Sequence, residues 1–158
     1  MRDATLTAII RLVPLLTTIQ HLEFTSQSGP NSRCAWSGQG KGTVKAVIRG
    51  NTIRFHERGH FIPEGHSRAV PFTNVYRWEV EPNCLRLFHE RRGAEHAVWL
   101  FDLIEDEASS TLVSHDAHLC GDDRYSARLT PLTNGFDLNW HIEGPRKDEA
   151  IHYRYRHT

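Results

Sequence analysis

Two acidic residues fall on faces that the sequence pattern predicts to be apolar. Glu57 shares its side of a predicted strand with Ile53 and Phe55. Asp123 likewise shares its side of another predicted strand with Tyr125. An unpaired buried carboxylate costs several kcal/mol or takes up a proton. Each of these side chains therefore needs an arginine, a hydrogen-bond donor or a ligand.

Two interpretations of the carboxylates remain open. In a cavity they would act as acid and base or orient a ligand, together with other polar and aromatic groups. As a structural pair near a barrel mouth they would be satisfied by Arg58, Arg146 or water, which is the commoner reason for burying a carboxylate. No catalytic residue can be assigned. The predicted ligand-binding residues are Glu57, Tyr76, Trp78, His89, Asp123, Tyr125, Trp140, Arg146 and Tyr153.

A metal site is a weaker possibility around residue 120. His118, Cys120 and Asp123 carry groups that bind zinc, and alternate residues of a strand face the same way. A structural zinc needs four ligands, however, and the chain has three cysteines and no second paired motif. No feature selects one of the 11 histidines as a haem ligand. We therefore expect no metal and no cofactor.

The segment Gly144-Pro145-Arg146-Lys147-Asp148 places two cations at a predicted turn. Backbone donors that converge at such a corner can bind an anion. A rigid turn whose arginine pairs internally explains the glycine and proline more simply, and we favour it. The sequence contains no nucleophile elbow, phosphate-binding loop, dinucleotide fingerprint or zinc-protease motif.

Three hairpin turns set the register of the strands that carry these residues. The turns are Gly50-Asn51, with Ile48 opposite Ile53; Pro82-Asn83, with Tyr76 opposite His89; and Asn134-Gly135, with Leu129 opposite Trp140. Glycines at 38, 40 and 42 share the apolar face, which suits close approach by a neighbouring segment. The predicted inner wall is Trp36, Val44, Ala46, Ile48, Ile53, Phe55, Tyr76, Trp78, Leu87, Tyr125, Leu129, Leu138, Trp140 and Ile142.

The number of strands indicates the fold class. With further strands at 96–103 and 150–156, the chain has eight or nine, mostly in hairpins with one apolar face. This pattern favours a single antiparallel up-and-down β-barrel over a sandwich, because closure removes exposed edges. We expect residues 1–158 to form one domain.

A short helix is predicted at the N-terminus, within residues 1–16. Leu6, Ile9, Ile10 and Val13 have helical spacing. Asp3 or Thr5 would cap this helix, Pro14 would end it, and it would pack on or cap the barrel.

Four motifs carry a resemblance to a known family. They are Phe55-His56-Glu57-Arg58-Gly59, Tyr76-Arg77-Trp78, the segment 118–125 and the segment 140–148. In this order and spacing they resemble domain of unknown function 6314, which is similar to the calycin group of lipocalin-like barrels. The resemblance covers residues 36 to 156 and implies a barrel, but no activity. The family usually begins with a strand containing tryptophan and arginine, whereas residues 19–25 contain neither.

Composition narrows the partners and the compartment. Lysine plus arginine equals aspartate plus glutamate at 19 each, so no net charge favours nucleic acid or an anionic membrane. The apolar stretch from Ala8 to Leu16 is interrupted by Arg11 and is too short to span a bilayer. Three cysteines suit a reducing compartment, and we expect a cytoplasmic protein.

Three functions remain open at this point. We prefer a protein that binds a small apolar or mixed-polarity ligand inside the barrel, a preference that rests on fold-level analogy. The first alternative is a small cofactor-independent isomerase, decarboxylase or hydrolase that uses interior carboxylates. The second is an interaction module with a filled barrel. The sequence also leaves a homodimer open.

Overall fold

The computed structural model describes residues 4–30, 32, 37–106, 108–115, 118–120 and 122–157, without the side chains of residues 4–8 and 118–120. One α-helix precedes eleven strands, and a short 3-10 helix lies between β5 and β6. The elements are α1 (Ala4–Thr17), β1 (His21–Ser28), β2 (Gly38–Arg49), β3 (Thr52–Pro63), β4 (Val70–Val80), β5 (Leu85–His89), η1 (Ala94–His96), β6 (Val98–Asp106), β7 (Thr111–Ser114), β8 (His118–Cys120), β9 (Asp123–Leu132), β10 (Gly135–Glu143) and β11 (Asp148–Arg156).

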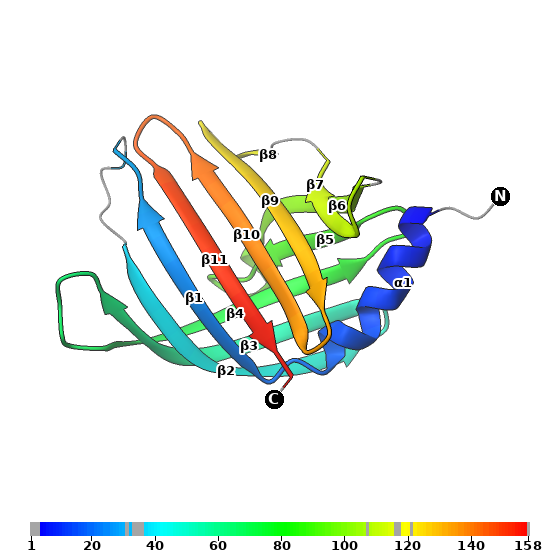
Figure 1. Ribbon diagram of the computed structural model, residues 1–158, viewed down its shortest axis with the longest axis horizontal. Coiled ribbons are helices and arrows are strands. Elements are labelled where there is room, and N and C mark those ends of the chain that lie inside the picture. The colour runs from blue at the N-terminus through cyan, green and yellow to red at the C-terminus, as the bar shows by residue number, and fades with distance from the viewer. Residues whose placement is uncertain are drawn as a thin grey trace.

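Ten strands close into an antiparallel up-and-down barrel, as the hairpin pattern predicts (Figure 1). Strands β1 to β6 each pair with the next, and β7 pairs with β9. Strand β9 pairs with β10 and β10 with β11, and β11 returns to pair with β1. Strand β8 pairs with the first residues of β9, beyond the part of β9 that meets β7. The count exceeds the predicted eight or nine because β7, with four residues, is too short for its alternation to be recognised.

Two of the three predicted hairpin registers are confirmed. Ile48 lies opposite Ile53, and Tyr76 lies opposite His89. The third register is wrong by two residues, because Leu129 lies opposite Leu138 rather than Trp140. The turn residues are Thr133 and Asn134, while Gly135 already pairs with Leu132. A shift of two residues keeps every side chain on its predicted face, so the predicted inner wall is unaffected.

The interior confirms most of the predicted inner wall. Nine of its residues are buried, and Ala46, Tyr125 and Ile142 are partly buried against them. Ile48 is a correction: it is 52% exposed, because it lies at the tip of the β2–β3 hairpin, where the core ends. Trp36 lies outside the described residues. The buried nine are Val44, Ile53, Phe55, Tyr76, Trp78, Leu87, Leu129, Leu138 and Trp140.

Helix α1 packs across one end of the barrel and contacts β2, β6 and β10 (Figure 1). It runs from Ala4 through Pro14 to Thr17, so the predicted end near Pro14 is wrong. Thr5 therefore lies inside the helix, and Asp3 lies outside the described residues.

The buried face of α1 also differs from the prediction. Ile9, Leu12 and Leu16 are buried, whereas Ile10 is 61% exposed. Burial of Leu16 beyond the proline helps to offset the one backbone hydrogen bond that a proline removes. No described helix is long and apolar enough to cross a membrane.

The helix end of the barrel is filled, while the opposite end is open. Trp78, Phe55 and Phe136 are fully buried, with Trp78 and Phe136 in edge-to-face contact at 6.0 Å between ring centroids. Leu85 and Leu103 fill the space around them and are also fully buried. The other end of the barrel, which we call the mouth, carries a cavity.

Gly135 provides a test of how closely the strands pack. Its φ is +152°, and a Cβ atom there would overlap the backbone carbonyl of Tyr155. We expect Gly135→Ala to lower the free energy of unfolding by roughly 3 kcal/mol or more, since steric overlap adds to the backbone strain. Gly50→Ala is the control: its φ is +61° with open space around it, so the loss should be about 1 kcal/mol. Urea denaturation measures both losses, and equal losses would contradict the close approach.

Candidate functional site

Glu57 lies inside the barrel, as its position in the alternation predicts. It is 2% exposed, and its Oε2 accepts a hydrogen bond of 2.6 Å from the Tyr155 hydroxyl. Its Oε1 is buried and has no hydrogen-bond partner among the described residues. Burial raises the pKa of Glu57 to about 8, and hydrogen bonding by Tyr155 and Asn74 only partly opposes this rise. At neutral pH the group is therefore a carboxylic acid rather than a carboxylate.

Three tyrosines surround this acid and remain neutral with it. The hydroxyls of Tyr76 and Tyr153 are 3.2 Å apart, and the rings of Tyr153 and Tyr155 are stacked at 5.3 Å. Burial, followed by the proximity of Glu57, raises the pKa of Tyr76 above its usual range. Burial also raises the pKa values of Tyr153 and Tyr155. The result is an uncharged hydrogen-bonding cluster, which we call the Glu57 cluster: Glu57, Tyr76, Tyr153 and Tyr155.

His89 joins the edge of the Glu57 cluster through its ring. It stacks on Tyr76 with 4.6 Å between the ring centroids. Burial, and then the positive charge of Arg91, lower the pKa of His89 to about 4. The imidazole is therefore neutral near pH 7, and it can donate or accept a hydrogen bond without adding charge.

A cavity of about 560 Å³ opens at the barrel mouth. Aromatic and aliphatic side chains form most of its wall, and charged groups lie among them. Tyr153 is the member of the Glu57 cluster that lines it, so it joins the cluster to the cavity. The lining residues are Phe24, Ser26, Phe61, Val70, Pro71, Phe72, Asn74, Arg91, Ile142, Lys147, Glu149, Ile151 and Tyr153.

Phe24 is the centre of the aromatic part of this wall. Its ring centroid lies 5.8 Å from that of Phe61, 5.5 Å from that of Phe72 and 5.1 Å from that of Tyr153. The ring lies over Gly40 of β2, where any Cβ atom would overlap it. The predicted role of the alternate glycines, close approach by a neighbour, is therefore confirmed at Gly40.

Sequence reasoning missed a carboxylate that lines the cavity, Glu149. It is 7% exposed and accepts 2.6 Å hydrogen bonds from the hydroxyls of Ser28 and Ser32. The signal is present in the sequence, because alternation places Ile151 and Tyr153 on one face of the strand predicted at 150–156. Counting back two residues from Ile151 along that face leads to Glu149.

Asp123, the second predicted interior carboxylate, has a different setting. It lies at the first residue of β9, and its Oδ2 is 3.7 Å from Nζ of Lys147. Asp123 thus pairs with Lys147 in the turn between β10 and β11, whereas Glu57 accepts its hydrogen bond from Tyr155 on β11 itself. Arg146 in that turn is exposed, and Lys147 rather than Arg146 lines the cavity.

The two interior tryptophans differ in their relation to the cavity. Trp78 lies in the filled end, away from the lining residues. Trp140 is 8% exposed and stacks against Tyr125 at 6.3 Å and against Tyr153 at 6.4 Å. In the part of the chain that the structure describes, Nε1 of each tryptophan is buried without a hydrogen-bond partner. Near Tyr153, the indole of Trp140 is therefore a donor with unused capacity.

The metal hypothesis concerned residues that the structure describes only in part. The side chains of His118 and Cys120 lie outside the described residues. Across the part of the chain that is described, no three His, Cys, Asp or Glu side chains form a group suited to a metal ion.

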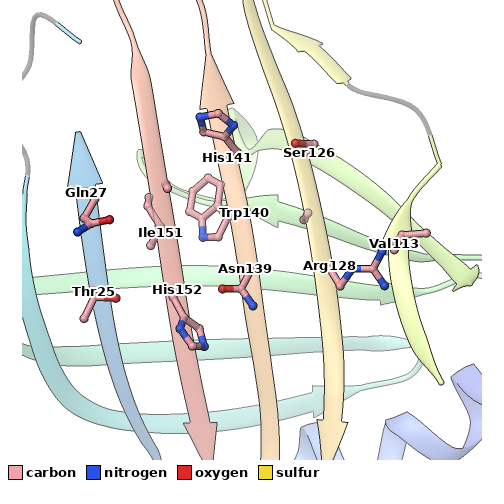
Figure 2. Close-up of a pocket in the computed structure, with 12 residues that line it drawn as sticks. Thr25, Gln27, Val113, Ser126, Arg128, Asn139, Trp140, His141, Ile151 and His152 are labelled. Carbon is pink, nitrogen blue, oxygen red and sulfur yellow. The ribbon is translucent and has the colours of Figure 1, made fainter. Parts of the chain in front are cut away.

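A second hollow, of about 630 Å³, lies on the outer surface of β1, β11, β10 and β9 (Figure 2). Both of its histidines are paired with carboxylates. His141 lies 2.9 Å from Glu143 and 2.8 Å from Asp148, and His152 lies 3.2 Å from Asp137. We therefore take the mouth cavity, with its unused buried polar atoms nearby, as the candidate site.

Fold and site together define a small antiparallel β-barrel with a largely apolar cavity at one end. The model of the Family of unknown function (DUF6314) matches residues 26–157, and the chain belongs to this family. No curated protein and no solved structure matches the chain.

Replacement of Glu57 by glutamine tests its protonation. Folding takes up a proton between the ordinary pKa of 4.5 and the folded value of about 8. Wild-type stability should therefore fall as pH rises through this window and level off above it. We expect Glu57→Gln to remove that loss, which makes it the more stable protein at pH 8 by on the order of 4 kcal/mol.

Urea denaturation across the same pH window measures this difference. Glu64→Gln is the matched control, because Glu64 is exposed in the β3–β4 loop and should show no such divergence from wild type. Parallel pH profiles for Glu57→Gln and wild type would mean that Glu57 is charged in the folded protein.

Proposed function

We propose that this barrel binds a small molecule of mixed polarity in its mouth cavity, as a carrier or a sensor. The observation that carries the proposal is the cavity itself, about 560 Å³ in volume, in a barrel whose other end is filled. Ligand pockets in proteins are typically concave, mainly apolar and supplied with a few polar groups. The mouth cavity meets each of these criteria.

The polar groups near the cavity indicate what the inner end of a ligand would meet. Tyr153 and Asn74 line the cavity, and Trp140 stacks behind Tyr153. These groups are neutral donors and acceptors, so they suit a hydroxyl, carbonyl or amide better than an ion. A ligand with such a group at its inner end and an apolar body fits the wall.

An enzyme that uses interior carboxyl groups is our second candidate function. The feature in its favour is the carboxylic acid of Glu57 beside three phenols, since perturbed acids concentrate in active sites. A general acid must come within hydrogen-bond reach of the reacting atom. Glu57 does not line the cavity and reaches it through its neighbours, so its role in this proposal is to position Tyr155.

We propose a cytoplasmic location because the protein has few cysteines. Cys84 is a free thiol, and the chain has too few cysteines for a disulfide framework. Burial raises the pKa of this thiol, so it is a poor nucleophile and has no part in the proposed site.

A matched pair of variants tests the proposal. Ile151→Trp fills the cavity from β11, whereas Ala150→Trp adds the same ring to the outer face of that strand. Native mass spectrometry of the purified protein and titration with the neutral dye N-phenyl-1-naphthylamine measure occupancy. We expect wild type and Ala150→Trp to bind alike, and Ile151→Trp to bind about tenfold more weakly because its cavity is filled.

Thermal unfolding verifies that both variants are folded. A wild-type protein that retains no molecule and does not bind the dye would contradict the proposal. Equal binding by wild type and Ile151→Trp would place the dye elsewhere and would contradict it as well.

A further inference from the structure

The charge of the ligand can be inferred from the one deeply buried charged side chain in the cavity wall. Glu149 is 7% exposed, yet among the described residues its hydrogen-bond partners are the neutral hydroxyls of Ser28 and Ser32. Buried carboxylates are normally paired with a cation. Toward the described residues, each oxygen of Glu149 accepts from one serine and keeps acceptor capacity for another donor.

Aromatic rings line the same cavity. Phe24, Phe61, Phe72 and Tyr153 all contribute to the wall, and Phe24 contacts the other three. The faces of aromatic rings attract cations, and the attraction grows when the cation is removed from water. A carboxylate among several rings is therefore a combination that favours a positively charged group.

Two cations also border the cavity, and their effect has to be weighed against that of Glu149. The side chain of Lys147 is 43% exposed and already pairs with Asp123 at 3.7 Å. Arg91 is exposed to solvent. Water and salt screen exposed charges much more than buried ones, so the field inside the cavity is governed by Glu149.

We propose that the mouth cavity binds an organic ammonium ion with an aromatic or alkyl body, its cationic end against Glu149 and its body against the rings of the wall. This inference rests on the proposed function and specifies the chemical class of its ligand. The ammonium group would donate hydrogen bonds to the free lone pairs of Glu149. The body would lie along the rings of the wall, and its far end, apolar or bearing a neutral polar group, would approach Tyr153.

Three probes with nearly the same skeleton test the inference: 3-phenylpropylammonium, 3-phenylpropanol and 3-phenylpropanoate. Isothermal titration calorimetry at neutral pH and low salt measures their affinities for the full chain. We expect the ammonium to bind about tenfold more tightly than the alcohol, and the carboxylate to bind most weakly. Glu149→Gln should reduce the advantage of the ammonium to less than about threefold and leave the alcohol unchanged.

Glu143→Gln is the matched control, since it removes the same charge from the same end of the barrel. Glu143 is exposed on the outer face of β10 and does not line the cavity. This variant should keep the wild-type order of affinities. Should Glu149→Gln fail to fold, the ratio between ammonium and alcohol in the wild-type protein decides: a tenfold preference supports the inference, and no preference overturns it.

The remaining outcomes separate this inference from the proposed function. If the carboxylate binds most tightly and Arg91→Gln abolishes that binding, the exposed cations select the ligand. The ammonium inference is then overturned, while the proposed binding function stands. If none of the three probes binds and the cavity-filling variant also changes nothing, both are overturned.

Discussion

The pairing of β11 with both β1 and β10 is the constraint on which the interior depends. Eight residues of β11 pair with β1, and nine pair with β10. This pairing closes the ring, and it places Glu149, Ile151, Tyr153 and Tyr155 one after another along the inner wall. The alternation of side chains then fixes their heights, from the mouth to the middle of the barrel. Tyr155 reaches Glu57 on β3, 98 positions earlier in the chain, because closure brings these strands across from each other.

Closure also divides the barrel into a filled end and an open end. At the filled end, α1 covers a core of fully buried aromatic and aliphatic residues, which supplies the large favourable term in folding. At the mouth the inward positions carry Ser26 and Glu149. These polar side chains need hydrogen-bond partners, such as the Ser28 hydroxyl that donates to Glu149, and apolar packing cannot supply them. The stability of one end thus permits polar atoms without partners, such as Oε1 of Glu57, toward the other. Proteins commonly place binding sites where local packing is sacrificed in this way.

Turn residues and side-chain alternation predicted the barrel and most of its inner wall. The alternation works because successive side chains of a strand point to opposite faces, whichever strand lies beside it. The Asn-Gly signal gave the third hairpin a register two residues off, yet Trp140 still points inward because the error preserves parity. The failures lie where strands end. Ile48 is exposed at a hairpin tip, and Asp123 pairs with a turn at the first residue of β9. Alternation gives a face but not a height along the barrel, so it could not show that Glu149, rather than Asp123, lines the cavity.

The two interior carboxyl groups show how environment assigns different tasks to one side-chain type. Glu57 lies among aromatic rings with one hydroxyl donor, and its raised pKa makes it a neutral group at pH 7. Glu149 lies at the mouth with a hydroxyl donor on each oxygen. A neutral acid deep in the barrel orders the tyrosines without imposing a charge on the ligand, whereas a carboxylate near the mouth imposes one. Polarity therefore changes along the cavity, from a neutral inner end to a charged entrance. That gradient would orient any ligand that has one apolar and one cationic end.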